Sequence, residues 1–326
     1  MTQSTFKRRR NGRDLSTLLW LCLAAWFLLS MGEARAAEPY ETENVILVII
    51  DGLRYSEGLG DPARQFVPKM DALSKRGAIV EPFTNDRHTF TSRAIPAIWC
   101  GAWTEVLPFA DKDCGGNWNS RCELPTIFEY YRKQLCRSKE DCIYVLPDVG
   151  CPWKASLDSE YGKDYWPVYH SVGETDMDVW HESEAMLSEH HPSFAVLYFD
   201  RVDHFGHSGS WSYYTRAIEL ADSIVGMVWE FVEEDSIYAG KTTMFVTNDH
   251  GRHTDDWTGH GCECEGCRTI QLLAIGPDIK EGFVSTTPRT LCDIVPTVGE
   301  LMGFCPEKST GSPMLELLRA PREEID

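Results

Sequence analysis

The sequence predicts an α/β fold, a three-layer α/β/α sandwich around a mostly parallel central sheet. Three observations support this class. Short apolar runs alternate with helix-like segments through most of the 326 residues. The run at Asn44–Ile50, NVILVII, is almost unbroken, as in a strand covered on both faces. A long segment at Trp211–Glu234 carries an apolar stripe, as a helix packed on such a sheet would. The content of 43% hydrophobic and 25% charged residues is typical of globular proteins.

The N-terminal residues 1–36 have the pattern of an export signal. Five basic residues precede an apolar segment at 15–31, and Ala34-Arg35-Ala36 fits a small-residue cleavage site. The apolar segment is short for a spanning helix, so we expect the signal to be removed. The mature chain would then be periplasmic or secreted, without a stable membrane span. If the segment is retained, the protein is membrane-anchored instead. A single domain is expected over residues 37–326.

The charge of the mature chain is strongly negative. The whole sequence has 31 basic and 50 acidic residues, and the signal accounts for six and two of them, which leaves 25 minus 48, or −23. Such a surface repels nucleic acid and anionic lipid, so no nucleic-acid-binding surface is expected. If the substrate is an anion, bound cations must reverse the local field.

The expected elements follow one another in α/β alternation. A helix at 67–76 is closed by Gly77, and the next helix, Thr91–Cys100, opens at a threonine. In order, the remaining elements are a helix at 125–135, strands at 143–147 and 193–199, the long helix, strands at Thr242–Thr247 and 270–275, and a helix at 291–302. This order is typical of a mostly parallel sheet with helices on its faces.

Residues 102–173 differ in composition from the rest. They are rich in Cys, Trp, Gly and Pro and hold few long periodic elements. We interpret them as a Cys-rich cap insertion on the core domain. The cap either lines a substrate site or is a disulfide-stapled excursion without a further role.

Twelve cysteines are present, and Cys22 lies in the signal. Eleven cysteines in an exported chain indicate disulfides and at least one leftover thiol. Local pairs are plausible for Cys114 with Cys122, Cys136 with Cys142, and Cys292 with Cys305. The row Cys262, Cys264 and Cys267, next to His260, is either a structural zinc site or disulfide-bonded. The compartment favours disulfides.

Polar residues suited to metal binding follow three of the expected strands. The first strand ends at Asp51, the strand at 193–199 leads to Asp203 and His207, and the third ends at Asp249 and His250. Ligands of open α/β sheets bind beyond the carboxyl ends of the strands. Carboxylate oxygen and imidazole nitrogen suit zinc and its neighbours. Each piece alone is weak, but three in sequence order predict a metal site.

The stretch HTFTSRAIPAIWCG, which starts at His88, offers a nucleophile. Thr91 is expected at a helix N-terminus, where free backbone N–H groups and the helix dipole favour anions. A metal ion can activate its hydroxyl. Thr89 competes with Thr91 for this role, and an N-cap is the alternative role for Thr91.

Together these motifs resemble the alkaline phosphatase superfamily of two-metal phosphatases, phosphodiesterases, sulfatases and phosphoethanolamine transferases. The similar segments are ILVIIDGLR, TSRAIPAIWCG, DHFGH, TNDHG, QLLAIGPDI and LCDIVPTVGELMG. They cover most of the mature chain, and their order and number make the resemblance specific. It implies an alkaline-phosphatase-like sandwich.

The resemblance also implies two metal sites and a substrate class. One divalent ion would be held by Asp51, Thr91, Asp249 and His250. The second would be held by Asp203, His207 and a later histidine, for which His260 is the best candidate although HGCECEGCR lengthens the gap before the last strand. Zinc suits these ligands best, with manganese as the alternative.

The implied reaction is hydrolysis of a phosphate monoester or diester, on a small-molecule, lipid or glycan substrate, with Thr91 as nucleophile. Arg93, Arg87 and Asn85 are candidate substrate contacts, with surface or capping roles as the alternative. Sulfatases of the superfamily generate their nucleophile from Cys or Ser, and neither stands at the corresponding position of TFTSR, which makes sulfate esters less favoured. A phosphoethanolamine or phosphoglycerol transferase, a sulfuric ester hydrolase and a metal-stabilised binding protein are the alternatives. The oligomeric state is not predicted.

Overall fold

The computed structural model describes residues 40–109, 119–148 and 156–320. The expected signal at 1–36, Cys22, Cys114 and Cys151 lie outside these ranges. Within them, no helix has the length and apolar character needed to cross a bilayer.

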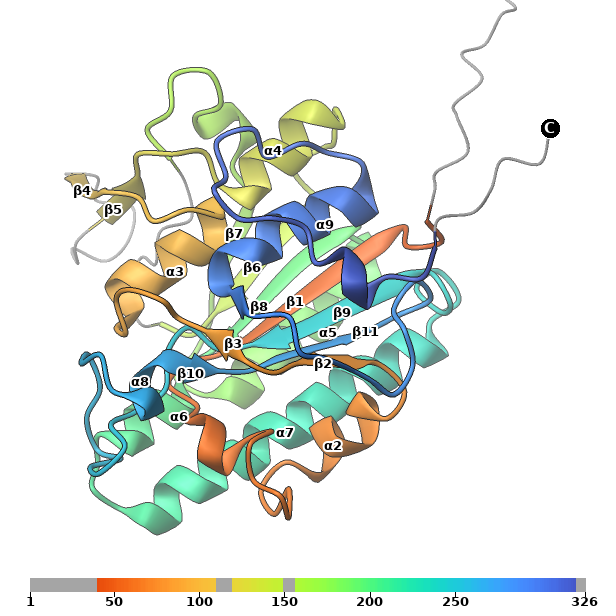
Figure 1. The fold of residues 1–326 in the computed structure, drawn as a ribbon. Coiled ribbons are helices and arrows are strands. Elements are labelled where there is room, and N and C mark those ends of the chain that lie inside the picture. Colours follow the sequence, from red (N-terminus) through yellow and green to blue (C-terminus); the bar gives the residue numbers. More distant parts are fainter. Residues whose placement is uncertain (1–39, 110–118, 149–155, 321–326) are drawn as a thin grey trace, which may run out of the picture. The chain divides into compact units, whose positions relative to one another are not determined.

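A central eight-stranded sheet organises the described part of the chain (Figure 1). Its spatial order is β12 (Phe283–Ser285), β2 (Ala78–Val80), β11 (Leu272–Ile275), β9 (Thr242–Thr247), β1 (Asn44–Ile50), β8 (Phe194–Phe199), β6 (Cys142–Leu146) and β7 (Val168–Ser171). Within this sheet, β11 alone runs antiparallel to its neighbours. The predicted mostly parallel sheet is therefore confirmed.

Helices cover both faces of the sheet (Figure 1). One face carries α3 (Thr91–Cys100), α4 (Ile127–Gln134) and α9 (Ile294–Met302), and the other carries α2 (Pro68–Ser74), α5 (Asp176–His190) and α7 (Trp211–Glu234). Alternate residues of β1 point to opposite faces, so Val45, Leu47 and Ile49 join one apolar core and Ile46, Val48 and Ile50 join the other. Each fully buried aliphatic side chain contributes roughly 1.5–3 kcal/mol. This is why NVILVII has no polar face.

The smaller elements lie around this sandwich. A three-stranded sheet is formed by β10 (Thr269–Ile270), β3 (Phe83–Thr84) and β13 (Arg289–Thr290), and a hairpin by β4 (Val106–Phe109) and β5 (Asn119–Cys122). Short helices are η1 (Tyr55–Glu57), η2 (Lys163–Tyr165), α6 (Arg201–Gly206), α8 (Glu265–Arg268), η3 (Leu291–Asp293) and η4 (Leu315–Leu317). The strand expected at 270–275 is thus split between two sheets, and the helix expected at 291–302 begins with a 3-10 turn.

The predicted cap at 102–173 is not confirmed as a separate insertion. Strands β6 and β7 of this segment belong to the central sheet, and α4 packs on one of its faces. Of these elements, α4 and β6 match the helix expected at 125–135 and the strand expected at 143–147, whereas β7 was not expected.

The predicted disulfides are absent from the described residues. Cys136, Cys142, Cys292 and Cys305 are all free thiols, and the partner proposed for Cys122 lies outside the described ranges. Cys142 is buried in β6 whereas Cys136 is exposed beyond α4. Sequence proximity was therefore a poor guide to pairing here.

Candidate metal centre

The first ligand group consists of Asp51, Asp249 and His250, all buried. Strands β1 and β9 pair in parallel register, with Ile49 opposite Thr247, so both strands end at the same edge of the sheet. His250 Nε2 lies 3.4 Å from Asp51 Oδ1 and 3.5 Å from Asp249 Oδ2. The three side chains converge on one point, as ligands of a single ion would.

The second ligand group consists of Asp203, His207 and His260. Strand β8 leads into α6, which carries Asp203, and His207 follows at its end. His207 Nε2 lies 3.2 Å from Asp203 Oδ2 and 3.0 Å from His260 Nε2. His260 comes from the loop between β9 and β10, so the structure brings the expected distant histidine to this group.

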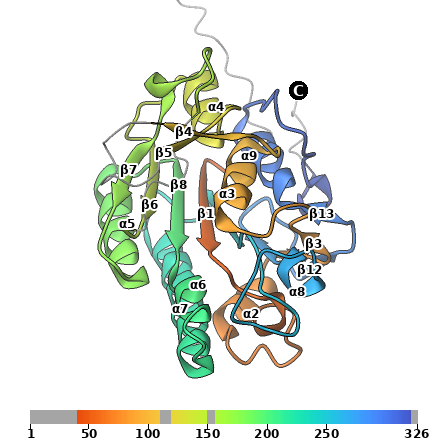
Figure 2. The ribbon, with the colours of Figure 1, turned by 90° about the vertical axis from the view of Figure 1, so that its left-hand side faces the viewer.

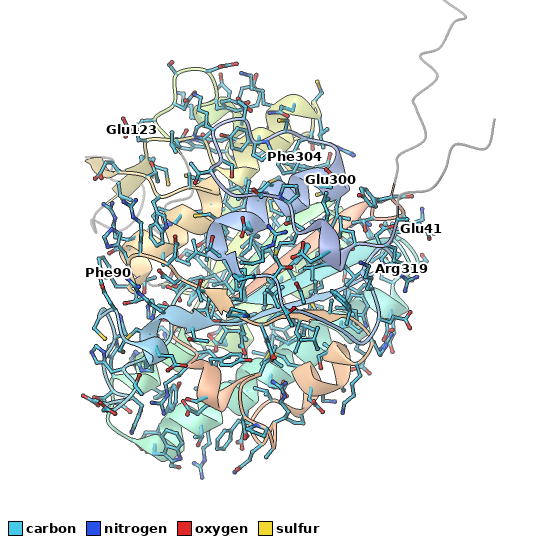
Figure 3. All side chains as sticks on the ribbon, in the orientation of Figure 1. Glu41, Phe90, Glu123, Glu300, Phe304 and Arg319 are labelled. Carbon is cyan, nitrogen blue, oxygen red and sulfur yellow. The ribbon has the colours of Figure 1, made fainter. Side chains whose placement is uncertain are left out.

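The two groups adjoin at the carboxyl ends of the parallel strands. The rings of His250 and His260 stack, with centroids 4.0 Å apart. Figure 2 shows the ends of β1 and β8 side by side, with α6 continuing from β8 and α3 beside β1. In Figure 3, Phe90, which precedes Thr91, and Glu41, which precedes β1, lie on opposite sides of the view.

Thr91 faces the first ligand group from the first position of α3. Its Oγ1 lies 3.2 Å from His250 Nε2 and 3.4 Å from Asp51 Oδ2. Thr89, the competing residue, directs its hydroxyl elsewhere, because its Oγ1 donates to the Cys262 carbonyl at 2.7 Å. Of the two threonines, Thr91 is the one at the centre.

The hydrogen bonds of two histidines fix which ring nitrogen is available to a metal. His250 Nδ1 lies 2.9 Å from the Gly251 carbonyl, and His260 Nδ1 lies 3.1 Å from the Thr89 carbonyl. A carbonyl oxygen only accepts, so each ring holds its proton on Nδ1 and turns the lone pair of Nε2 toward the centre. This is the tautomer that metal ligation through Nε2 requires.

The electrostatics of the centre call for added positive charge. Burial, together with Asp249 and Asp203, raises the pKa of Asp51 well above its ordinary range. Burial and the Asp203 charge raise the pKa of Asp249 to about 7. Asp249 Oδ2 is buried without a hydrogen-bond partner. Burying carboxylates in this way is costly unless cations neutralise them, and divalent ions fit the carboxylate and imidazole donors present.

Arg252 is a buried residue of the centre that the sequence interpretation did not include. Its Nη1 donates to Asp203 Oδ1 at 2.5 Å, and its Nη2 donates to the Thr258 carbonyl. Burial would raise the pKa of Asp203, but the Arg252 guanidinium beside it holds this pKa below its ordinary value. Arg252 thus keeps Asp203 ionised and contacts its Oδ1, so that Oδ2 of Asp203 faces His207.

Two further contacts escaped sequence reasoning. The Tyr198 hydroxyl, on β8, donates to Asp51 Oδ2. Gly52 has φ of +68°, and a Cβ there would lie 2.6 Å from Asp203 Oδ1. Gly206 lies in α6, where a Cβ would collide with the Arg252 guanidinium. Of these contacts, only the one at Gly52 has a signal in the sequence, the Asp51-Gly52 pair. That pair is equally compatible with a simple turn.

The remaining candidates lie around the centre. Asn85 is buried, and its amide donates to the carbonyls of His88 and Asp249 at 2.8 Å each, so it positions the backbone there. Arg93 pairs with Glu105 at 3.4 Å. Asp200 pairs with Arg201, and His204 is exposed, so neither joins a ligand group.

Comparison with known proteins agrees with the fold and with the binding of metal ions. The Metalloenzyme superfamily family model matches residues 167–306, which contain Asp203, His207, Asp249, His250 and His260. The 2,3-bisphosphoglycerate-independent phosphoglycerate mutase of Desulforudis audaxviator is 30% identical over 128 residues, 37% of this chain and 23% of the relative. Sulfatase ppz1 of Metarhizium majus is 27% identical over 125 residues, 36% of this chain and 28% of the relative.

Two solved structures share the fold over most of the chain. The phosphonate monoester hydrolase of Agrobacterium radiobacter has a TM-score of 0.62 at 14% identity, covering 86% of this chain and 78% of that one. Murine ectonucleotide pyrophosphatase/phosphodiesterase 5 has a TM-score of 0.63 at 12% identity, covering 85% of this chain and 100% of that one.

The sandwich with its two adjoining ligand groups has the arrangement of a metal-dependent enzyme. The family model and the similar proteins belong to the alkaline phosphatase superfamily. The chain spans less than a third of the length of either of these two sequence relatives, and their activities are properties of those longer proteins.

Proposed function

We propose that the protein hydrolyses phosphate esters, monoesters or diesters, with Thr91 as the nucleophile and two divalent ions, zinc or manganese, as cofactors. Asp51, Thr91, Asp249 and His250 would hold one ion, and Asp203, His207 and His260 the other. Such ions polarise a phosphoryl oxygen, activate a nucleophile and stabilise a leaving oxygen, at a typical separation of about 4 Å.

The observation that carries the proposal is the position of the Thr91 hydroxyl. Its Oγ1 lies within 3.5 Å of both Asp51 carboxylate oxygens and 3.2 Å from His250 Nε2. A binding protein with structural metals would need no hydroxyl there. The N-terminus of the ten-residue helix α3 favours negative charge beside Thr91.

The surrounding residues would orient the reacting groups. Tyr198 and Arg252 each occupy one carboxylate oxygen, of Asp51 and Asp203, and leave the other toward the centre. The carbonyls that hold Nδ1 of His250 and His260 fix both rings. Arg93, close to the start of α3, would approach an anionic substrate after leaving Glu105.

The test is a panel of phosphate monoesters, phosphate diesters and sulfate esters, assayed with the metal-loaded protein. We expect phosphate-ester turnover that falls by about 10³-fold or more in Thr91→Ala, as for loss of other catalytic nucleophiles. Metal content should be unchanged. The neighbouring exposed Ser92→Ala is the matched control and should keep full activity.

Other outcomes would redirect the assignment. Full activity in Thr91→Ala would refute the nucleophile. Turnover of sulfate esters alone would indicate a sulfuric ester hydrolase, an alternative that the similarity to a sulfatase supports. Product that appears only with an added alcohol or amine acceptor would indicate a transferase. Cell fractionation tests the proposed export, with the protein expected outside the cytoplasm.

A further inference from the structure

A third cluster of metal-binding side chains lies apart from the two ligand groups. It consists of His253, Cys262, Cys264 and Cys267, called the thiolate group below. All four residues come from the segment between β9 and β10, which also carries His260, with Cys267 inside the short helix α8. The sequence interpretation considered a zinc site here with His260 as neighbour, but the structure turns His253 toward the three sulfurs instead.

The four ligand atoms of the thiolate group lie close enough together to surround one ion, with two distances at tetrahedral values and two shorter. His253 Nδ1 lies 2.9, 3.8 and 3.3 Å from the sulfurs of Cys262, Cys264 and Cys267. The sulfurs of Cys262 and Cys267 are 3.7 Å apart. Zinc–sulfur bonds of about 2.3 Å and zinc–nitrogen bonds of about 2.0 Å imply edges of about 3.5–3.8 Å in a tetrahedral site.

The same distances argue against a disulfide. A sulfur–sulfur bond is about 2.05 Å long, far shorter than the 3.7 Å between Cys262 and Cys267. The backbone N–H of Cys264 donates to the Cys262 sulfur at 3.3 Å, as is usual for a ligating thiolate. Cys264 and Cys267 have the C-x-x-C spacing common in structural zinc sites.

We propose that the thiolate group binds a third metal ion, a structural zinc held by three thiolates and one imidazole. Three soft sulfur donors select zinc over magnesium, calcium or manganese. With four protein ligands the ion has no open position, so it contributes to folding rather than to the reaction.

The ion would also fix the loop that presents His260. The His253 N–H donates to the Gly259 carbonyl at 2.8 Å, directly before His260. On the other side, the Thr89 hydroxyl donates to the Cys262 carbonyl while the Thr89 carbonyl accepts from His260 Nδ1. This consequence rests on the proposed role of His260, whereas the binding of zinc does not.

The test measures metal binding without any assay of turnover. Metal analysis of the full-length protein should give one more equivalent in wild type than in Cys264→Ser with Cys267→Ser, while Cys136→Ser, an exposed free thiol, matches wild type. Cobalt-loaded wild type should show sulfur-to-cobalt charge-transfer absorption. The band should vanish in the double variant and persist in Asp51→Asn, which disturbs only the first ligand group.

A second measurement needs no variant. A mercurial reagent that titrates thiols should release one equivalent of zinc from wild type. Release of no zinc, or a thiol count showing Cys262, Cys264 and Cys267 oxidised in metal-loaded protein, would overturn the proposal. Failure here with intact Thr91-dependent turnover would leave the proposed function standing, and the reverse result would leave the zinc site standing.

Discussion

The rings of His250 and His260 stack with their planes 22° from parallel and their centroids 4.0 Å apart. One histidine belongs to each ligand group, so the contact joins the two groups. Each Nδ1 is held by a carbonyl, and neither ring can turn without losing that hydrogen bond. Burial lowers the pKa of His260 to about 4, which keeps its ring neutral at physiological pH.

Replacing His260 should therefore remove one ion and leave the other. We expect His260→Ala to lose the ion of the second ligand group, because only Asp203 and His207 remain, while the first group keeps all its ligands. Metal analysis after dialysis measures this, with the exposed His204→Ala as control. Full retention of metal in His260→Ala would show that the second ligand group is wrongly composed.

Asp249 should make the metal-free protein less stable as the pH rises. Its pKa is about 7 when folded and about 3.9 when unfolded, so the folded state binds the extra proton between these values. The protonated Asp249 carboxyl stabilises the folded state fully below about pH 4. This contribution is lost as the pH rises through about 7, which lowers the free energy of unfolding by on the order of a few kcal/mol. Denaturant unfolding of chelator-treated protein at pH 5 and pH 8 measures it.

Asp249→Asn is the matched variant, since an amide does not titrate. The difference in unfolding free energy between wild type and variant should shift with pH in favour of the variant at pH 8. An unchanged difference across this range would mean that Asp249 titrates normally. Metal affinity of the wild type should rise over the same range, because the ligand must be deprotonated.

Tyr198→Phe should weaken the binding of the ion in the first ligand group without unfolding the protein. The hydroxyl is lost from one oxygen of Asp51, and comparable losses of an outer hydrogen bond cost about 10- to 100-fold in metal affinity or activity. Tyr144→Phe is the control, because the Tyr144 hydroxyl is buried without a partner. Equal metal affinities of the two variants would show that the Tyr198 hydroxyl does not orient Asp51.

Gly52→Ala should damage the second ligand group directly. The new Cβ would lie 2.6 Å from Asp203 Oδ1 at a positive φ of +68°. Gly240→Ala has the same backbone cost at φ of +71° but meets nothing within 4 Å. We expect about 1 kcal/mol of destabilisation in the control. Gly52→Ala should lose more stability together with one metal equivalent, and equal behaviour of the two variants would exclude the close approach.

The sequence was sufficient for the elements with strong periodicity. Asn44–Ile50, Thr91–Cys100, Trp211–Glu234 and Thr242–Thr247 have the predicted bounds. Apolar alternation failed at 270–275, because Gln271 leaves the strand and accepts from the Leu59 backbone through its side chain. Inside 102–173 the expected helix and strand are present as α4 and β6, but β7, whose side chains are only partly buried, was missed.

The candidate site could be predicted where ligands follow strands, since parallel topology brings strand ends together. Asp51, Asp203, His207, Asp249 and His250 are of this kind. Arg252 and Tyr198 could not be found, because their roles depend on tertiary packing against a ligand rather than on spacing. His253 was missed for the same reason, as the loop must fold back before it meets the cysteines.

The order of strands in the sheet has a consequence for biosynthesis. Strand β1 is the first of the sheet in the sequence, yet both its neighbours, β8 and β9, follow more than 140 residues later. During translation this strand, with six apolar residues in seven, has no partner on either hydrogen-bonding edge, a condition that promotes aggregation. Nascent chains that end before Phe194 should accordingly depend on chaperones for solubility, which ribosome-bound truncations of increasing length would reveal.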